Sequence, residues 1–111
     1  MKEFMFLFRL PTYDYSKATP AEMQGLAKKW KDWGDGIKAQ GKFVREGIRL
    51  SMEGKVLKAS GVTDGPFAET KEVLGSFIIV KAENIDEATT LAHGCPALEA
   101  GGSVEIRQII G

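Results

Sequence analysis

The chain has 111 residues, 43% hydrophobic and 27% charged, which suits a single soluble globular domain over residues 1–111. Its 15 basic residues equal its 15 acidic residues, which argues against non-specific binding to nucleic acid or to a membrane surface, because both need a basic excess. The single cysteine, Cys95, excludes an intrachain disulfide and favours a cytoplasmic location. No run approaches the roughly 18 apolar residues of a transmembrane helix.

The first third of the chain predicts a strand followed by a helix. Lys2 to Arg9 is short and rich in phenylalanine, which is typical of a buried strand. Thr19 to Glu22 has the pattern of a capping box with proline at the first helical position, so a helix should begin there. It should run to about Gln40 and stop at Gly41. Its apolar face is formed by Met23, Leu26, Ala27, Trp30, Trp33 and Ile37.

The middle of the chain predicts further strands. Phe43 to Leu50 has strand composition, and Gly47 marks a bulge or a close approach within it. Glu53 and Gly54 signal a turn, after which Lys55 to Ala59 would pair back as an optional hairpin. The clearest strand is Gly75 to Lys81, because four apolar residues follow one another in it.

The last third predicts a second helix and a final strand. Asn84 is a good helix cap, and Glu87 occupies the third helical position after it. Gly94 and Pro96 should end this helix. Ser103 to Ile110 is the last predicted strand.

The order of elements predicts a ferredoxin-like α+β fold, βαββαβ, with an additional hairpin. Phe4, Phe6 and Phe8 lie on one face of the first strand, whereas Met5 and Leu7 lie on the other. Both faces of such a strand must be buried, and the predicted helices suffice for only one of them. We therefore expect a homodimer in which two sheets pack face to face.

The stretch from Val62 to Glu72 concentrates bend-forming and ionisable residues. Gly65 and Pro66 favour a rigid bend that Phe67 would anchor. Such a bend would hold Asp64, Glu69 and Lys71 in defined positions, as an active site requires. The alternative is a structural bend in which Asp64 binds local backbone amides.

Glu46 is a further candidate because it alternates with Val44 and Ile48 along a predicted strand. On an inward face it would be a buried general base. On an outward face it would lie in water or pair with Arg49 or Arg107.

Several residues are candidates for contacting a ligand. Tyr13 and Tyr15 lie in a predicted loop, where aromatic side chains have less structural reason to occur. Pro66 and Phe67 belong to the rigid bend, and Arg107 lies on the last strand, facing either a cavity or solvent. Trp30 and Trp33 would either stack on an aromatic ligand or form part of the core.

No phosphate-binding loop, dinucleotide fingerprint, zinc-ligand spacing or nucleophile elbow is present in the sequence. We therefore expect no metal and no nucleotide or flavin cofactor.

The segment Asp64-Gly65-Pro66-Phe67-Ala68-Glu69-Thr70-Lys71-Glu72 resembles the signature of the DGPF subgroup of the YCII-related proteins. Asn84 to Ala88 and Gly102 to Arg107 resemble the C-terminal half of that family. The resemblance implies a dimeric α+β barrel, a fold shared by small enzymes and ligand-binding modules. The wider family is associated with a histidine and aspartate pair, and the only histidine here, His93, does not match its position.

Two functions follow as hypotheses. The first is a non-catalytic dimeric module that binds a small-molecule ligand or has a regulatory role. The alternative is a cofactor-independent enzyme that performs proton transfer, elimination or isomerisation on a compact cyclic or aromatic substrate. In the alternative, the acid and base groups would come from Glu46, Asp64, Glu69 and Lys71.

Overall fold

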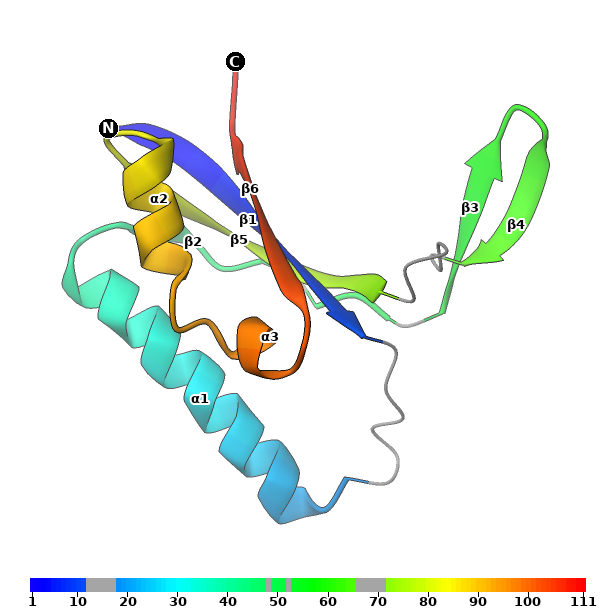
Figure 1. The fold of residues 1–111 in the computed structure, drawn as a ribbon, viewed down its shortest axis with the longest axis horizontal. Helices are drawn as coiled ribbons and strands as arrows, with labels where there is room; N and C mark the ends of the chain where they lie inside the picture. The colour runs from blue at the N-terminus through cyan, green and yellow to red at the C-terminus, as the bar shows by residue number, and fades with distance from the viewer. Residues whose placement is uncertain (12–17, 48, 52, 66–71) are drawn as a thin grey trace.

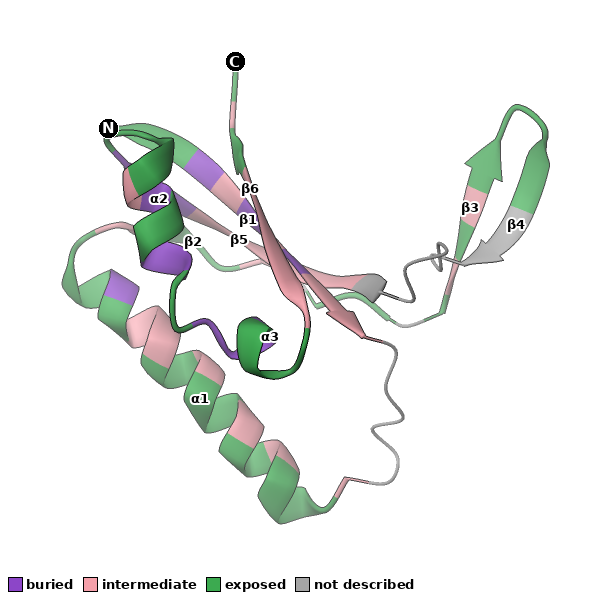
Figure 2. Cartoon of the chain, in the orientation of Figure 1, coloured by how far each residue is buried: buried purple, intermediate pink, exposed green. Residues whose placement is uncertain are grey.

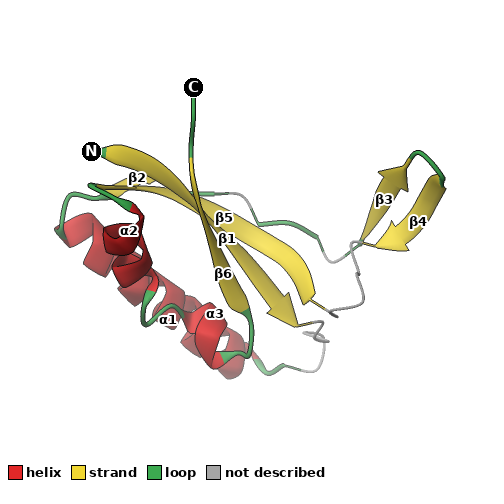
Figure 3. Ribbon diagram, turned by 45° about the horizontal axis from the view of Figure 1, so that its top comes forward, coloured by secondary structure: helices red, strands yellow, loops and turns green. Residues whose placement is uncertain are grey.

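The computed structural model describes residues 1–11, 18–47, 49–51, 53–65 and 72–111. Within these residues the main sheet is antiparallel, with the strand order β2-β5-β1-β6. Its strands are β1 (Lys2–Pro11), β2 (Phe43–Arg45), β5 (Glu72–Ala82) and β6 (Ser103–Gln108). The helices α1 (Pro20–Ala39), α2 (Ile85–Ala92) and α3 (Pro96–Glu99) all lie on one face of this sheet (Figures 1 and 3). The architecture is α+β and is consistent with a ferredoxin-like fold.

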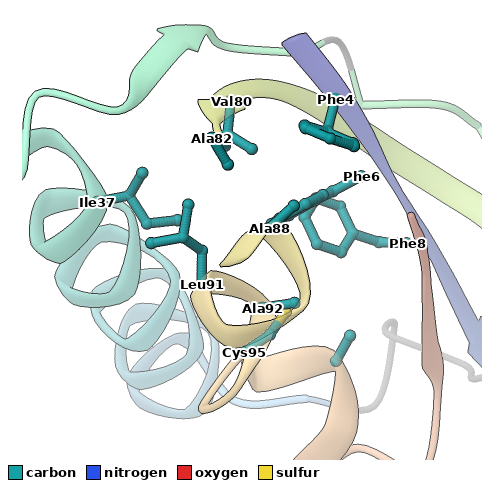
Figure 4. Packing of buried hydrophobic residues seen from close by; sticks show 11 residues of the cluster. Phe4, Phe6, Phe8, Ile37, Val80, Ala82, Ala88, Leu91, Ala92 and Cys95 are labelled. Atoms are coloured by element: carbon teal, nitrogen blue, oxygen red, sulfur yellow. The ribbon is translucent and has the colours of Figure 1, made fainter. Parts of the chain in front are cut away.

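The core lies between β1 and the helices. Phe4, Phe6 and Phe8 are all buried and point to the helical side, where Figure 4 shows them beside α2. Ile37 of α1 and Leu91 of α2 point toward one another at the other end of the same cluster. The alternation expected along β1 therefore places every second residue in the core.

Both long helices begin where their caps predict. The Thr19 hydroxyl accepts a hydrogen bond from the Glu22 amide at 3.1 Å, and the Asn84 side chain accepts one from the Glu87 amide at 2.8 Å. Gly41 follows α1 with a φ of 70°, which glycine adopts without strain. The sequence did not predict α3, because Pro96 was interpreted only as a helix end, although proline also favours the first position of a helix.

The strand expected over Phe43 to Leu50 is shorter in the structure, because β2 ends at Arg45. Its register on β5 shifts between Phe43 and Arg45. Beyond it, Gly47 lies so close to the backbone of Phe77 that a Cβ atom would collide with the Phe77 carbonyl. The close approach expected at Gly47 is therefore present.

The hairpin differs from its prediction in which strands it joins. Lys55 to Ala59 was expected to pair back on the preceding strand, but β3 (Gly54–Lys58) pairs forward with β4 (Gly61–Gly65). Gly61 has a φ of 137°, which permits the tight reversal between them. The hairpin stands apart from the main sheet (Figure 1), and the part whose burial is described is largely exposed (Figure 2).

Replacing Gly47 with alanine should destabilise the protein by about 1–3 kcal/mol, because the methyl group meets backbone rather than a side chain that can move. Gly25→Ala is the matched control, since nothing lies within 4 Å of its Cβ position and alanine favours a helix by up to about 1 kcal/mol. Urea unfolding, followed by circular dichroism, measures the free energy of unfolding of both variants. Equal stability of the two variants would contradict the close approach at Gly47.

Candidate functional site

A groove with a volume of about 500 Å³ lies between α1 and the sheet. Its walls come from α1, the end of β1, the segment that follows β2, and β5. Its main apolar lining residues are Phe8, Trp30, Trp33, Phe43, Leu50 and Ile78. This volume falls in the range of small-molecule sites, which are concave, mostly apolar and provided with a few polar groups.

The groove stays open because aromatic rings connect α1 to β1. The Phe8 ring lies 4.9 Å from the ring of Trp30 and 5.7 Å from that of Trp33, both edge-on. The Trp33 indole is oriented by a hydrogen bond of 3.2 Å that it donates to the Leu91 carbonyl. Both indoles remain half-buried, and Ile37 is the one residue of α1 that is fully buried. Much of the inward face of α1 is therefore only half-buried, as its colours in Figure 2 show.

Gly34 contributes to this space. A Cβ atom there would lie 4.0 Å from the nearest ring atom of Phe43, an ordinary contact distance. A larger side chain in the same place would extend into the groove. The absence of a side chain at Gly34 thus leaves the groove open next to Phe43 of β2.

The charged residues of α1 that border the groove are paired with residues of the opposite charge. Lys31 Nζ lies 2.7 Å from Asp35 Oδ2, and Lys38 Nζ lies 3.3 Å from Glu46 Oε1. Lys38 Nζ also lies 5.0 Å from the centre of the Phe43 ring. The hydrogen bond from Lys31 lowers the pKa of Asp35 below its ordinary value, and the same bond raises the pKa of Lys31.

Arg49 borders the groove on the opposite side, and its backbone is fixed by β5. Between Phe8 and Arg9 the register of β1 on β5 shifts, so that Gly75 has no partner on β1. The Gly75 carbonyl instead accepts a hydrogen bond of 2.8 Å from the Leu50 amide. Bulges of this kind often occur next to functional sites, where they redirect the chain. Within the described part of the chain, Arg49 makes no ion pair or hydrogen bond.

The structure separates the candidate residues that it describes. Glu46 borders the groove, but its side chain retains 75% of its exposure and pairs with Lys38 rather than with Arg49 or Arg107. Asp64 lies in β4, opposite Lys55, within the hairpin that stands apart from the main sheet (Figure 1). Glu46 and Asp64 therefore belong to different parts of the molecule.

Arg107 lies on the face of the sheet that carries no helices, opposite Met5. It donates a hydrogen bond of 3.1 Å to Glu105, which also accepts one of 2.6 Å from Arg9. The hydrogen bond from Arg107 and the charge of Arg9 hold the pKa of Glu105 below its ordinary value. The remaining candidates, Tyr13, Tyr15, Pro66, Phe67, Glu69 and Lys71, lie outside the described residues.

Four charged residues of the groove were not singled out as a site from the sequence: Lys31, Asp35, Lys38 and Arg49. Three of them follow one another on α1 at spacings of four and three residues, which places them along one side of the helix. That spacing is a signal in the sequence by which these three residues could have been grouped together. Arg49 reaches the groove only through the bulge at Gly75, which the sequence does not reveal.

Cys95 belongs to the core rather than to a site. It is buried, and burial raises the pKa of its thiol to about 11, so little thiolate forms near neutral pH. Among the described residues, no group of three histidine, cysteine, aspartate or glutamate side chains is arranged to hold a metal ion. The described helices include none with the length and apolarity required to cross a membrane.

Comparison with known proteins identifies a family and a similar solved structure. A family model described as the YCII-related domain matches residues 5–111. The structure is that of 5-chloro-2-hydroxyhydroquinone dehydrochlorinase (TftG) from Burkholderia phenoliruptrix, in complex with 2,5-dihydroxybenzoquinone. It is 19% identical, with 97% of this chain and 93% of that chain covered and a TM-score of 0.47. A search of curated protein sequences gave no match.

Removing the Lys31 ammonium should raise the pKa of Asp35 toward its ordinary value. The pair exists above that lowered pKa and is lost as the pH falls through it, so Lys31→Met should shift the titration of Asp35 to higher pH. Carboxyl-carbon NMR titration measures this directly. Lys28→Met, which removes the partner of Asp32 one turn earlier, should leave Asp35 unchanged. If Lys31→Met leaves the titration of Asp35 unchanged, the ion pair between these two residues is contradicted.

Proposed function

We propose that this chain, which belongs to the YCII-related domain family, is a ligand-binding module. The groove beside α1 would hold a compact aromatic or alicyclic molecule. The observation that carries this proposal is the half-buried pair Trp30 and Trp33 beside a volume of about 500 Å³. Aromatic side chains left facing open space are suited to stack on a ring of the ligand.

The state of the ionisable groups favours binding over catalysis. Asp35 and Glu46 are both matched by lysines, and the lowered pKa of Asp35 makes it a weaker base. A general base works best with a pKa near the operating pH, which usually requires burial or a nearby negative charge. Cys95 is excluded as a nucleophile by its raised pKa and its position in the core.

A second candidate function is the cofactor-independent enzyme, and Glu46 supports it because this carboxylate borders the same groove as the tryptophans. Its partner Lys38 lies at 3.3 Å, and both side chains are exposed. Because an exposed ion pair contributes little free energy, a ligand could displace the lysine at a small cost in stability. Glu46 would then face the ligand as a proton acceptor. Chemical change of a ring compound, abolished by Glu46→Gln, would favour this function over simple binding.

We also propose that two copies associate through the face of the sheet that no described helix covers (Figure 3). Met5 and Leu7 lie there opposite Ile79 and Phe77, and all four are only half-buried. An apolar patch of this kind usually marks an interface. The proposal gives a dimeric α+β barrel, which is also what the DGPF-like segment from Asp64 to Glu72 implies.

The ligand proposal predicts binding of the neutral probe naphthalene-2-carboxamide, detected by calorimetry and by a change in tryptophan fluorescence. Gly34→Leu should weaken that binding by about tenfold or more, since the new side chain extends into the groove. Gly25→Leu is the control on the same helix, because Gly25 has no neighbour within 4 Å and does not border the groove. Equal binding by both variants would contradict a ligand site in the groove.

The dimer proposal predicts that light scattering at micromolar concentration gives twice the mass of one chain. Leu7→Glu should produce monomers, because it places a charge in the proposed interface. Leu98→Glu is the control: Leu98 is 48% exposed on α3, on the helical side of the sheet. Circular dichroism establishes that both variants keep the fold. A monomeric unmodified protein would refute the interface.

A further inference from the structure

The charges that border the groove do not balance. Among the described residues, the lysine and aspartate or glutamate pairs Lys31–Asp35 and Lys38–Glu46 each sum to zero, and Arg49 is left over. We propose that the ligand is a monoanion, a compact aromatic or alicyclic carboxylate whose acid group binds Arg49. This inference rests on the proposed function and adds the chemical class of the ligand.

Arg49 is suited to this role by its chemistry. A guanidinium group offers planar, paired donors that match the two oxygens of a carboxylate, and it stays charged at any physiological pH. Leu50 and Phe43 give this part of the groove apolar surface. A carboxylate held there would exchange part of its water for the guanidinium, which strengthens the attraction relative to open solvent.

The backbone of Arg49 is also held in place before any ligand arrives. On one side, Gly47 packs against the backbone of Phe77. On the other side, the Leu50 amide binds the carbonyl of the bulged Gly75. The backbone of Arg49 is thus fixed at both ends, so binding loses little backbone freedom and the affinity is correspondingly higher.

The two lysines are less suited to receive the acid group. Lys31 is hydrogen-bonded to Asp35 at 2.7 Å, and a ligand carboxylate near it would meet the charge of Asp35. Lys38 lies between Glu46 and the face of the Phe43 ring. With the acid group on Arg49, the ring of the ligand extends toward the indoles of Trp30 and Trp33 across the groove.

The test compares two probes of nearly equal shape, naphthalene-2-carboxylate and naphthalene-2-carboxamide, on the full chain by isothermal calorimetry. The carboxylate should bind about tenfold more tightly than the amide, and added salt should reduce the difference. Arg49→Met should abolish the preference, so that the two probes bind with equal affinity, because the carboxylate then loses its charged partner. Arg49→Lys, which keeps the charge but not the paired donors, should give an intermediate preference.

Arg45→Met is the control variant, because Arg45 is an exposed arginine of β2 that does not border the groove. It should keep the full preference. Equal affinity of the unmodified protein for the two probes, or a preference that survives Arg49→Met, would overturn the assignment while the proposed groove stands. Absence of binding by both probes would instead overturn the proposed function and this inference with it.

Discussion

The packing of Phe8 against Trp30 and Trp33 is the interaction on which the rest of the structure depends. The three rings lie 4.9 to 6.0 Å apart and edge-on to one another, a favourable arrangement of aromatic side chains. They connect α1 to β1 through large side chains. A long helix is thereby attached to the sheet while space remains beside it, and that space is the groove.

Glycines determine the opposite wall of the groove. Gly47 allows the segment after β2 to lie against the backbone of β5, and the bulge at Gly75 frees a carbonyl group to bind it. Neither contact involves a side chain, so the wall tolerates changes at its exposed residues more readily than at these two positions. This explains why the backbone of Arg49 is held although its side chain is exposed and makes no ion pair with the described residues.

Local signals in the sequence predicted the elements, and non-local contacts explain what they missed. Thr19 and Asn84 marked both long helices because a cap acts on amides only three residues away. The alternation along β1 identified the buried phenylalanines in the same way. The hydrogen bond between Leu50 and Gly75, next to Arg49, depends on how the chain returns in space. The groove also depends on non-local contacts, since residues from four separate segments form it.

Strand β5 joins the two proposed surfaces of the molecule. Its register places Ser76 opposite Phe8 on the helical side and Phe77 opposite Leu7 on the other. One side thus borders the groove and the other the proposed partner copy, so a shift of one residue would exchange the two. The bulge at Gly75 ends this regular pairing where Leu50 binds, beside Arg49. The bulge that holds the backbone next to Arg49 therefore lies in β5, the same strand that would pack against a second copy.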